Sequence, residues 1–152
     1  MPSVGGAVPN VRSVPFGGMF DVSTADPART RKFLKIIGVV ALIDVFLLVP
    51  LLLGYLDVFD SDSFVGPVGG THGTTFLVLA GVVTWGAFKA GLWGWRLPAA
   101  IVGANVVLFG LLQVLNSDDP PTLLAIPAAI LIVIPLAADV LASRELARKT
   151  AG

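Results

Sequence analysis

Residues 33–56 read FLKIIGVVALIDVFLLVPLLLGYL, a run of apolar side chains broken by Lys35 near its start and Asp44 at its middle. An α-helix rises ~1.5 Å per residue, so this run is long enough to cross a hydrocarbon core of ~30 Å. Basic residues lie at one end and acidic residues at the other: Arg29, Arg31, Lys32 and Lys35, then Asp57, Asp60 and Asp62. Because positive charge favours the cytoplasmic side, the run predicts a membrane-spanning helix that begins in the cytoplasm.

The composition of the whole chain fits a protein in lipid. Hydrophobic residues make up 55% of the 152 residues and charged residues 13%, whereas soluble domains carry about 25% charged residues. The chain has no cysteine, which excludes disulfides, thiolate metal ligands and a cysteine nucleophile. No basic region followed by an apolar run precedes residue 33. We therefore expect no cleavable signal peptide and a first span that acts as its own insertion signal.

Three further apolar segments complete a set of four candidate spans: residues 71–95, 98–115 and 122–142. All ten lysines and arginines fall in the N-terminal segment, in residues 89–96 or in the C-terminal tail, whereas loops 57–70 and 116–121 hold five aspartates and no base. The positive-inside rule therefore predicts an all-α, multi-pass protein of the cell membrane. It has four transmembrane helices in an up-down bundle, with both termini cytoplasmic.

Local signals mark the ends of these segments. Asp26 and Pro27 suit the N-cap and the first position of a helix, so the transmembrane domain is expected over residues 26–149, before a tail at 150–152. Pro50 is expected to bend the first helix. Three tryptophans near the cytoplasmic end of the second span suit the headgroup level of a bilayer: Trp85, Trp93 and Trp95.

Residues 1–25 differ from the rest of the chain, because four glycines and three prolines interrupt any helix or strand period. Apolar residues nevertheless recur through the segment: Val4, Val8, Val11, Val14, Phe16, Met19 and Phe20. One interpretation is a loose terminus. The other, on which our functional prediction depends, is an extended cytoplasmic arm whose apolar side chains bind a partner protein.

Small residues are expected to hold the bundle together, because lipid provides no hydrophobic drive for the association of helices. They recur along the second and third segments: Gly86, Ala90, Gly94, Ala100 and Ala104. Side chains of this size let two backbones approach closely, so we expect these positions to form helix–helix contacts.

Four polar residues are expected at depth in the membrane: Asp44, Asn105, Gln113 and Asp139. An ionised aspartate at the centre of a span costs ~2.5–3.5 kcal/mol on insertion scales, so we expect Asp44 to face protein and either to pair with another group or to be protonated. We expect Asp44 to hydrogen-bond to Asn105 or to face a partner chain, and Asp139 to be neutralised by Lys35 or Lys89. A proton relay needs further titratable groups, and none is expected beside Asp44, which favours a structural carboxylate.

His72 is the single histidine and lies where the second span is expected to open. We favour a histidine that is hydrogen-bonded to the loop backbone at the start of this helix. The alternative is a haem or metal ligand, for which carboxylates such as Asp118 or Asp119 would have to join it. No cofactor is expected. Bound anionic lipid is expected at the basic cluster: Arg29, Arg31, Lys32 and Lys35.

Residues 66–76 read GPVGGTHGTTF. This stretch resembles the G-P-x-H-G-x-x-F signature of an uncharacterised family of small bacterial integral membrane proteins, in which the motif follows a first span and opens a second. The matching positions are Gly66, Pro67, His72, Gly73 and Phe76. Three extra residues separate Pro67 from His72, and a fourth span is expected where that family looks three-spanning. The resemblance implies a small bacterial membrane protein.

The sequence contains no phosphate-binding loop, nucleophile elbow or nucleic-acid-binding stripe, so we expect no enzyme. The arm, the small-residue faces and the few ionisable groups at depth predict a non-catalytic accessory or structural subunit of a larger membrane complex, respiratory or transport. It would dock on larger integral membrane subunits through residues 1–25. One alternative is a small homo-oligomeric transporter or channel with Asp44 in the pathway. The second is a haem- or metal-binding electron-transfer protein that uses His72.

Overall fold

A computed structural model describes residues 18–55, 63, 65–115 and 125–152, and for residues 55, 108–115 and 125–132 it describes the backbone alone. The described residues form four α-helices and no strand: α1 (Pro27–Tyr55), α2 (Val65–Phe88), α3 (Arg96–Leu115) and α4 (Ala125–Ala151). The all-α prediction is confirmed. Each helix corresponds to one of the four apolar segments of the sequence.

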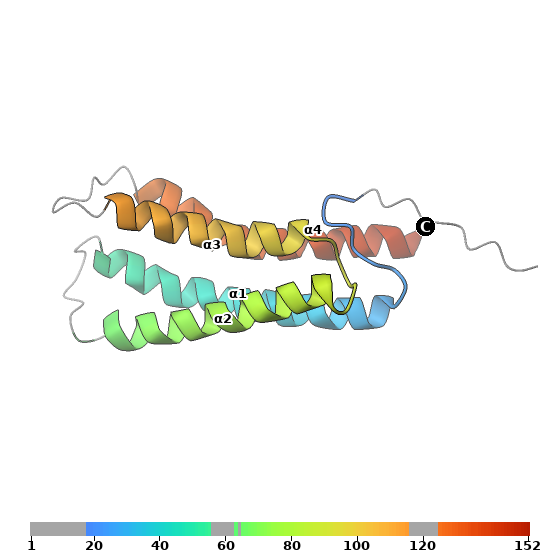
Figure 1. The fold of residues 1–152 in the computed structure, drawn as a ribbon, viewed down its shortest axis with the longest axis horizontal. Coiled ribbons are helices and arrows are strands. Elements are labelled where there is room, and N and C mark those ends of the chain that lie inside the picture. Colours follow the sequence, from blue (N-terminus) through green and yellow to red (C-terminus); the bar gives the residue numbers. More distant parts are fainter. Residues whose placement is uncertain (1–17, 56–62, 64, 116–124) are drawn as a thin grey trace, which may run out of the picture.

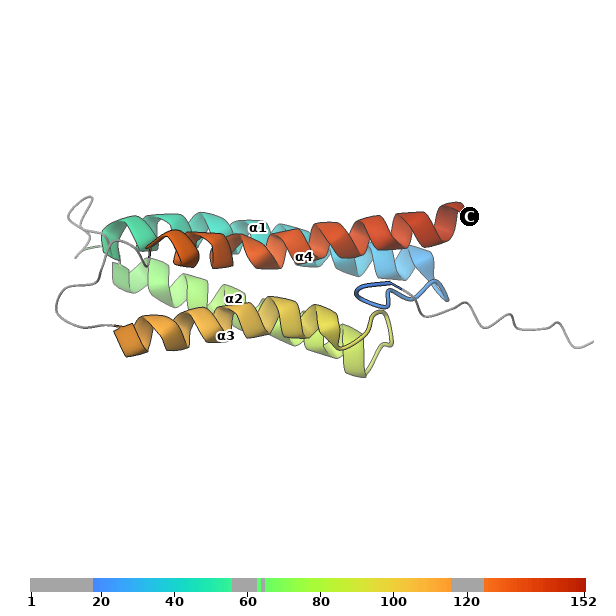
Figure 2. The ribbon, with the colours of Figure 1, turned by 90° about the horizontal axis from the view of Figure 1, so that it is seen from above.

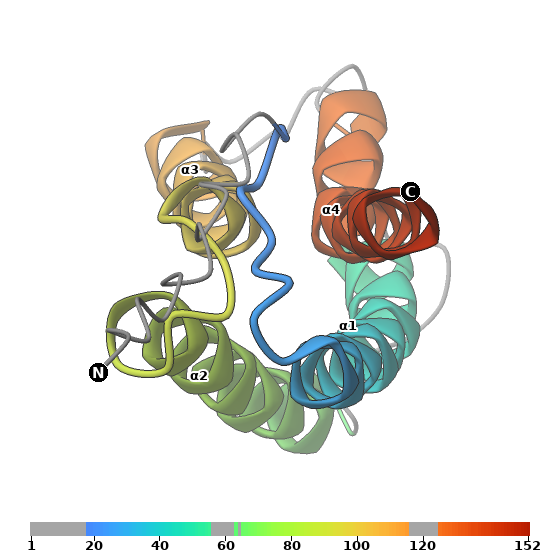
Figure 3. The same ribbon diagram turned by 90° about the vertical axis from the view of Figure 1, so that its right-hand side faces the viewer.

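The four helices lie side by side in an up-down order (Figure 1, Figure 2). α1 and α3 each contact both α2 and α4, so α1 and α3 occupy opposite corners when the bundle is viewed along its length (Figure 3). We call the end that carries the start of α1, the α2–α3 turn and the end of α4 the basic end. Residues 18–25 cross this end between the helices (Figure 3).

The start of α1 follows from its local sequence. Asp26 Oδ1 accepts a hydrogen bond from the Arg29 N–H at 2.9 Å, and Pro27 is the first residue of the helix. The carboxylate thus satisfies an exposed N–H group, and the proline stands where its missing N–H is not needed. Pro50 lies within α1, which continues past it to Tyr55.

α2 begins and ends earlier than the sequence predicts. The expected span covers residues 71–95, whereas the helix covers Val65–Phe88, so residues 66–70 form its first turns instead of a loop. Pro67 is tolerated there because the first turn of a helix does not need its N–H. The hydroxyls of Thr71, Thr74 and Thr75 donate to carbonyls one turn earlier, at 2.8, 3.0 and 2.9 Å. As a result His72 lies within α2 and not at its start.

Among the side chains that the structure describes, the fully buried apolar ones lie mostly in the half of the bundle near the basic end. Side chains that are at most 4% exposed come from all four helices and from the crossing segment, among them Phe20, Val22, Leu34, Ile37, Leu79, Val83, Leu97, Ile101, Ala142 and Leu146. Large apolar side chains also cover the outside of the bundle, including Phe46 at 71% exposed, Leu77 at 70% and Val107 at 61%. Among the described residues, one helix, over Pro27–Gly54, is long and apolar enough to cross a membrane.

Trp93 corrects one sequence prediction, because it does not lie at the surface with Trp85 and Trp95. Its side chain is 3% exposed, its ring packs against Gly86, and its Nε1 donates to the Val83 carbonyl at 3.0 Å. The cause is the turn after α2, where Gly91 adopts a φ of 61°. This left-handed conformation, which glycine adopts without strain, directs the chain back toward α2.

Candidate functional site

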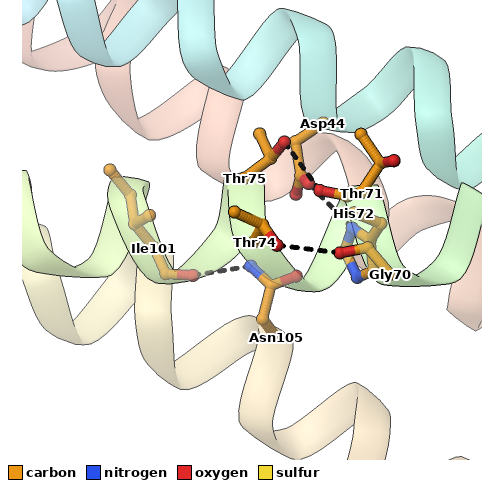
Figure 4. A network of polar contacts seen from close by, with 8 residues as sticks. All are labelled: Asp44, Gly70, Thr71, His72, Thr74, Thr75, Ile101 and Asn105. Carbon is orange, nitrogen blue, oxygen red and sulfur yellow. Dashed lines mark hydrogen bonds and ion pairs between the residues drawn. The ribbon is translucent and has the colours of Figure 1, made fainter.

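Two ionisable side chains, the buried Asp44 and the partly exposed His72, join α1 to α2 (Figure 4). The Asp44 side chain is 3% exposed, and its Oδ1 lies 2.7 Å from Nδ1 of His72, whose side chain is 24% exposed. Burying a carboxylate without a partner is costly, so the imidazole explains how α1 carries an aspartate at its midpoint. With a proton on Nδ1 the ring donates to the carboxylate, and with both nitrogens protonated the contact becomes a salt bridge.

Asp44 does not bond to Asn105, so that sequence prediction is wrong. The Asn105 Nδ2 donates to the Ile101 carbonyl, one turn earlier in α3, at 2.8 Å (Figure 4). α3 lies diagonally across the bundle from α1, whereas α2 is a direct neighbour of α1. Because α2 starts early, His72 lies at the level of Asp44. The expectation that no titratable group accompanies Asp44 is therefore also wrong.

Hydroxyl groups extend this polar cluster along α2. Thr71, Thr74 and Thr75 flank His72 on the helix (Figure 4). Each hydroxyl donates to its own helix and keeps a lone pair for a further donor. The contact within the cluster that could pass a proton is the one between the Asp44 carboxylate and the His72 imidazole. Within the part of the chain that the structure describes, no group of three or more His, Asp or Glu side chains could hold a metal ion. Asp118 and Asp119 lie outside that part.

A second polar cluster holds residues 18–25, which we call the strap, against α4. Glu145 accepts the N–H of Phe20 on Oε2 at 3.0 Å and the N–H of Val22 on Oε1 at 3.1 Å. Lys149 Nζ lies 2.9 Å from Glu145 Oε1 and donates to the Val22 carbonyl at 3.1 Å. Because Glu145 is only 3% exposed, this carboxylate and its lysine satisfy strap backbone groups inside the protein.

The α2–α3 turn holds the other side of the strap. The Ser23 N–H donates to the Leu92 carbonyl at 2.8 Å, and the Gly94 N–H donates to the Phe20 carbonyl at 2.9 Å. The side chains of Phe20 and Val22, both 2% exposed, enter the core. The strap thus closes the basic end of the bundle between α4 and the α2–α3 turn (Figure 3).

The path of the strap backbone depends on small or tolerant residues. A Cβ on Gly18 would overlap the Glu145 carboxylate, and a Cβ on Gly94 would lie 3.1 Å from Cβ of Asp21. Asp21 has a φ of 50°, a left-handed conformation in which aspartate is enriched several-fold over most other residues. These constraints define one path for the strap, in contrast to a loose tail.

Glu145 is held in its ionised form. Burial raises the pKa of its carboxyl group, but the hydrogen bond from the Phe20 N–H, the bond from Lys149, the Val22 N–H and the lysine charge lower it by more. The pKa of Glu145 therefore lies below its ordinary value of 4.5. The carboxylate that anchors the strap thus carries its charge at neutral pH.

The predicted arm residues fall in different settings. Five of them lie outside the described residues: Val4, Val8, Val11, Val14 and Phe16. Met19 is 65% exposed, whereas Phe20 is buried in the core of its own chain. Phe20 is therefore not available to a partner, which corrects the prediction. The reason is that Glu145 fixes the Phe20 backbone with the side chain directed inward.

Asp139 lies on α4 and faces α1. It is 6% exposed, and a Cβ on Gly38 would lie 2.6 Å from its Oδ2. Its Oδ1 has no hydrogen-bond partner among the described residues. Lys35 and Lys89 are exposed, and the ion pairs found in the described ranges involve Asp44 and Glu145. The expected neutralisation of Asp139 by a lysine is therefore wrong. The side chain of Gln113 lies outside the described residues.

The small residues of the second and third segments have several neighbours. The Trp93 ring packs against Gly86, and the strap packs against Gly94 at Phe20 and Asp21. Two of the alanines, Ala90 and Ala100, pack against the buried core, and Ala104 is half-buried. The two glycines thus accommodate the α2–α3 turn and the strap.

Sequence reasoning missed the strap and its anchor. The spacing of Glu145 and Lys149 shows that they can pair along α4, but it does not show that Glu145 points inward. The available signal is the alternation of apolar Phe20, polar Asp21 and apolar Val22, which indicates that the segment has one buried face. No family model, curated protein or solved structure matches this chain, so its function is argued from its geometry.

Proposed function

We propose that the chain is a four-span protein of the cell membrane with both termini in the cytoplasm. α1 has the length and hydropathy of a membrane span, and large apolar side chains are exposed on the outside of α1, α2, α3 and α4. Exposing such an apolar surface to water costs free energy, whereas exposing it to the hydrocarbon core of a bilayer does not. The lysines and arginines of the described residues lie at the start of α1, in or next to the α2–α3 turn and at the end of α4, which supports a cytoplasmic position for the basic end.

Within the membrane, the chain acts as a non-catalytic accessory subunit of a larger complex. The observation that carries this proposal is the strap, in which Phe20 and Val22 seal the basic end and Glu145 fixes their backbone. A bundle that is sealed by its own chain favours a packing role over passage of a solute between its helices. The strap also fixes the point at which residues 1–17 join the bundle, and a fixed attachment lowers the entropy lost when that segment docks on a partner.

Co-purification tests this function. The full chain, tagged at its C-terminus, is extracted in mild detergent beside a variant that lacks residues 1–17 and keeps the strap. We expect the full chain to co-purify with larger integral membrane proteins, and the truncated chain to lose them while it elutes as a single folded species. A full chain that elutes alone, as a monomer or a homo-oligomer, contradicts the accessory role.

The Asp44–His72 pair favours a second candidate, a small homo-oligomeric transporter or channel with Asp44 in its pathway. Ionisable residues inside membrane proteins commonly mark proton and ion pathways, and the contact of 2.7 Å makes proton exchange between the two groups feasible. If this candidate is correct, proton flux into vesicles that contain the purified chain is lost in Asp44→Asn and kept in Arg31→Gln. Absence of proton flux into vesicles that contain the unmodified chain would contradict the transporter or channel role.

A further inference from the structure

A shallow apolar groove runs along the outer surface between α1 and α2. It has a volume of about 420 Å³ and is lined by Phe33 of α1 and by Gly81, Val82 and Trp85 of α2. No atom lies within 4 Å of the position that a Cβ on Gly81 would occupy. The missing side chain at this position therefore keeps the groove open.

Two cationic residues, Arg29 and Lys89, lie at one end of this groove. The guanidinium carbon of Arg29 lies 5.7 Å from the centre of the Trp85 ring, which lies 5.1 Å from the Phe33 ring. Lys89 is one helical turn beyond Trp85, since its N–H donates to the Trp85 carbonyl at 2.9 Å. Arg29, Lys32 and Lys89 are all exposed. The acidic residue nearest to Arg29 along the chain, Asp26, caps the first turn of α1.

The groups follow one another in the order that a phospholipid requires. Arg29 lies in the first turn of α1, Phe33 and Trp85 lie one turn deeper, and Gly81 lies a further turn along α2. In a bilayer, this order places Arg29 at the level of the lipid phosphates, the Trp85 ring at the membrane interface and Gly81 at the level of the acyl chains. The groove is apolar and offers no polar side chain that would pair with the backbone of a peptide.

We propose that this α1–α2 groove binds one acyl chain of an anionic phospholipid, with the lipid phosphate on Arg29. The proposal rests on the orientation of the bundle in the membrane given above. A zwitterionic headgroup brings its own cation to a rim that already holds the charges of Arg29 and Lys89, whereas an anionic headgroup does not. We therefore expect lipids of net negative charge to be selected, with Lys32 and Lys89 adding attraction at longer range.

Quenching of tryptophan fluorescence by brominated acyl chains tests the proposal. The full chain with Trp95→Phe is placed in two vesicle preparations. A minor fraction of the lipid carries bromine on its acyl chains in both, and this fraction is phosphatidylglycerol in one preparation and the same amount of phosphatidylcholine in the other. Trp85 then reports on the groove, because Trp93 is buried. We expect brominated phosphatidylglycerol to be enriched at Trp85 about five-fold over brominated phosphatidylcholine, as one cation–phosphate contact allows.

Matched variants separate the groove from a general attraction of charge. Arg29→Gln and Gly81→Leu should each abolish the enrichment, the first by removing the phosphate contact and the second by filling the groove. Arg31→Gln removes one charge from the same cluster, away from Trp85, and should keep the enrichment. Equal quenching by the two lipids overturns the lipid site while the chain remains in the bilayer. Absence of quenching by either lipid shows that the groove is not in the bilayer, which overturns the proposed membrane orientation as well.

Discussion

Asp44 and Glu145 are buried carboxylates with partners of different kinds. Asp44 meets an imidazole between two helices, at 2.7 Å. Glu145 meets two backbone N–H groups and a lysine at the basic end of the bundle. In both cases a group from a different part of the chain compensates for desolvation of the charge, so that each carboxylate fixes one element against another.

Replacing His72 by alanine leaves the Asp44 carboxylate buried without its partner. We expect His72→Ala to lower the free energy of unfolding by about 3 kcal/mol, near the lower end for a broken buried ion pair. The double variant Asp44→Asn/His72→Ala should recover part of this loss, because no buried charge remains. Thermal unfolding in detergent measures both. Additive effects of the two single changes would show that the side chains are not coupled.

Acid is expected to release the strap through Glu145. The folded carboxyl has a lower pKa than its ordinary value of 4.5, so the folded state binds fewer protons than the unfolded state. The stabilisation that ionised Glu145 provides is therefore complete above pH 4.5, and it is lost as the pH falls through the lower pKa of the folded state. The Phe20 and Val22 amides should be protected from hydrogen exchange at neutral pH and should lose this protection in acid, measured against the exchange rate of an unstructured amide at the same pH.

The variant Glu145→Ala should expose the same two amides at neutral pH, at a cost of about 1–3 kcal/mol for each donor that loses its acceptor. Arg144→Ala, at the exposed neighbouring position, is the control and should leave protection unchanged. Fast exchange of both amides in the unmodified protein at neutral pH would contradict the strap contacts.

At the scale of the elements, the α2–α3 turn connects the strap, the core and the end of α2. Its hydrogen bonds to the strap come from Leu92 and Gly94, and Trp93 between them packs on Gly86. A change at Gly86 should therefore disturb more than one helix.

Gly86→Ala and Gly81→Ala form a matched pair in α2. A methyl group on Gly86 would overlap the Trp93 ring, whereas Gly81 has open space. We expect Gly86→Ala to destabilise the protein by about 1–3 kcal/mol, as overpacking does, and to shift Trp93 fluorescence to the red. Gly81→Ala should be neutral or slightly stabilising, since alanine favours a helix over glycine. Equal stability of the two variants would contradict the buried position of Trp93.

The sequence predicts the elements better than their contacts. The four helices and the Asp26 N-cap follow from apolar runs and local hydrogen bonding, which depend on nearby residues. The Asp44 partner does not, because glycines at the start of α2 are typical of a loop, and the helix that they form instead brings His72 to Asp44. The strap resembles a linker in composition. Its fixed path arises from Glu145, which is 125 residues away from Phe20 along the chain.

At the scale of the whole molecule, the account depends on how charge and apolar surface are distributed. The basic end is closed by the strap, and the outside of the bundle is covered by apolar side chains such as Phe46, Leu77 and Val107. A membrane accommodates both features at once, with the apolar surface in lipid and the strap at the cytoplasmic face. The proposed accessory role and the proposed lipid site both require this orientation.

Labelling of single cysteines in intact cells tests that orientation most directly, because the chain contains no cysteine of its own. Cysteine is introduced at Ser3, Ser61, Ser117 or Ala151 and exposed to a maleimide that does not cross membranes. The account predicts that Ser61→Cys and Ser117→Cys react in intact cells, and that Ser3→Cys and Ala151→Cys react only after permeabilisation. Reaction of Ser3→Cys and Ala151→Cys on opposite sides of the membrane would contradict it.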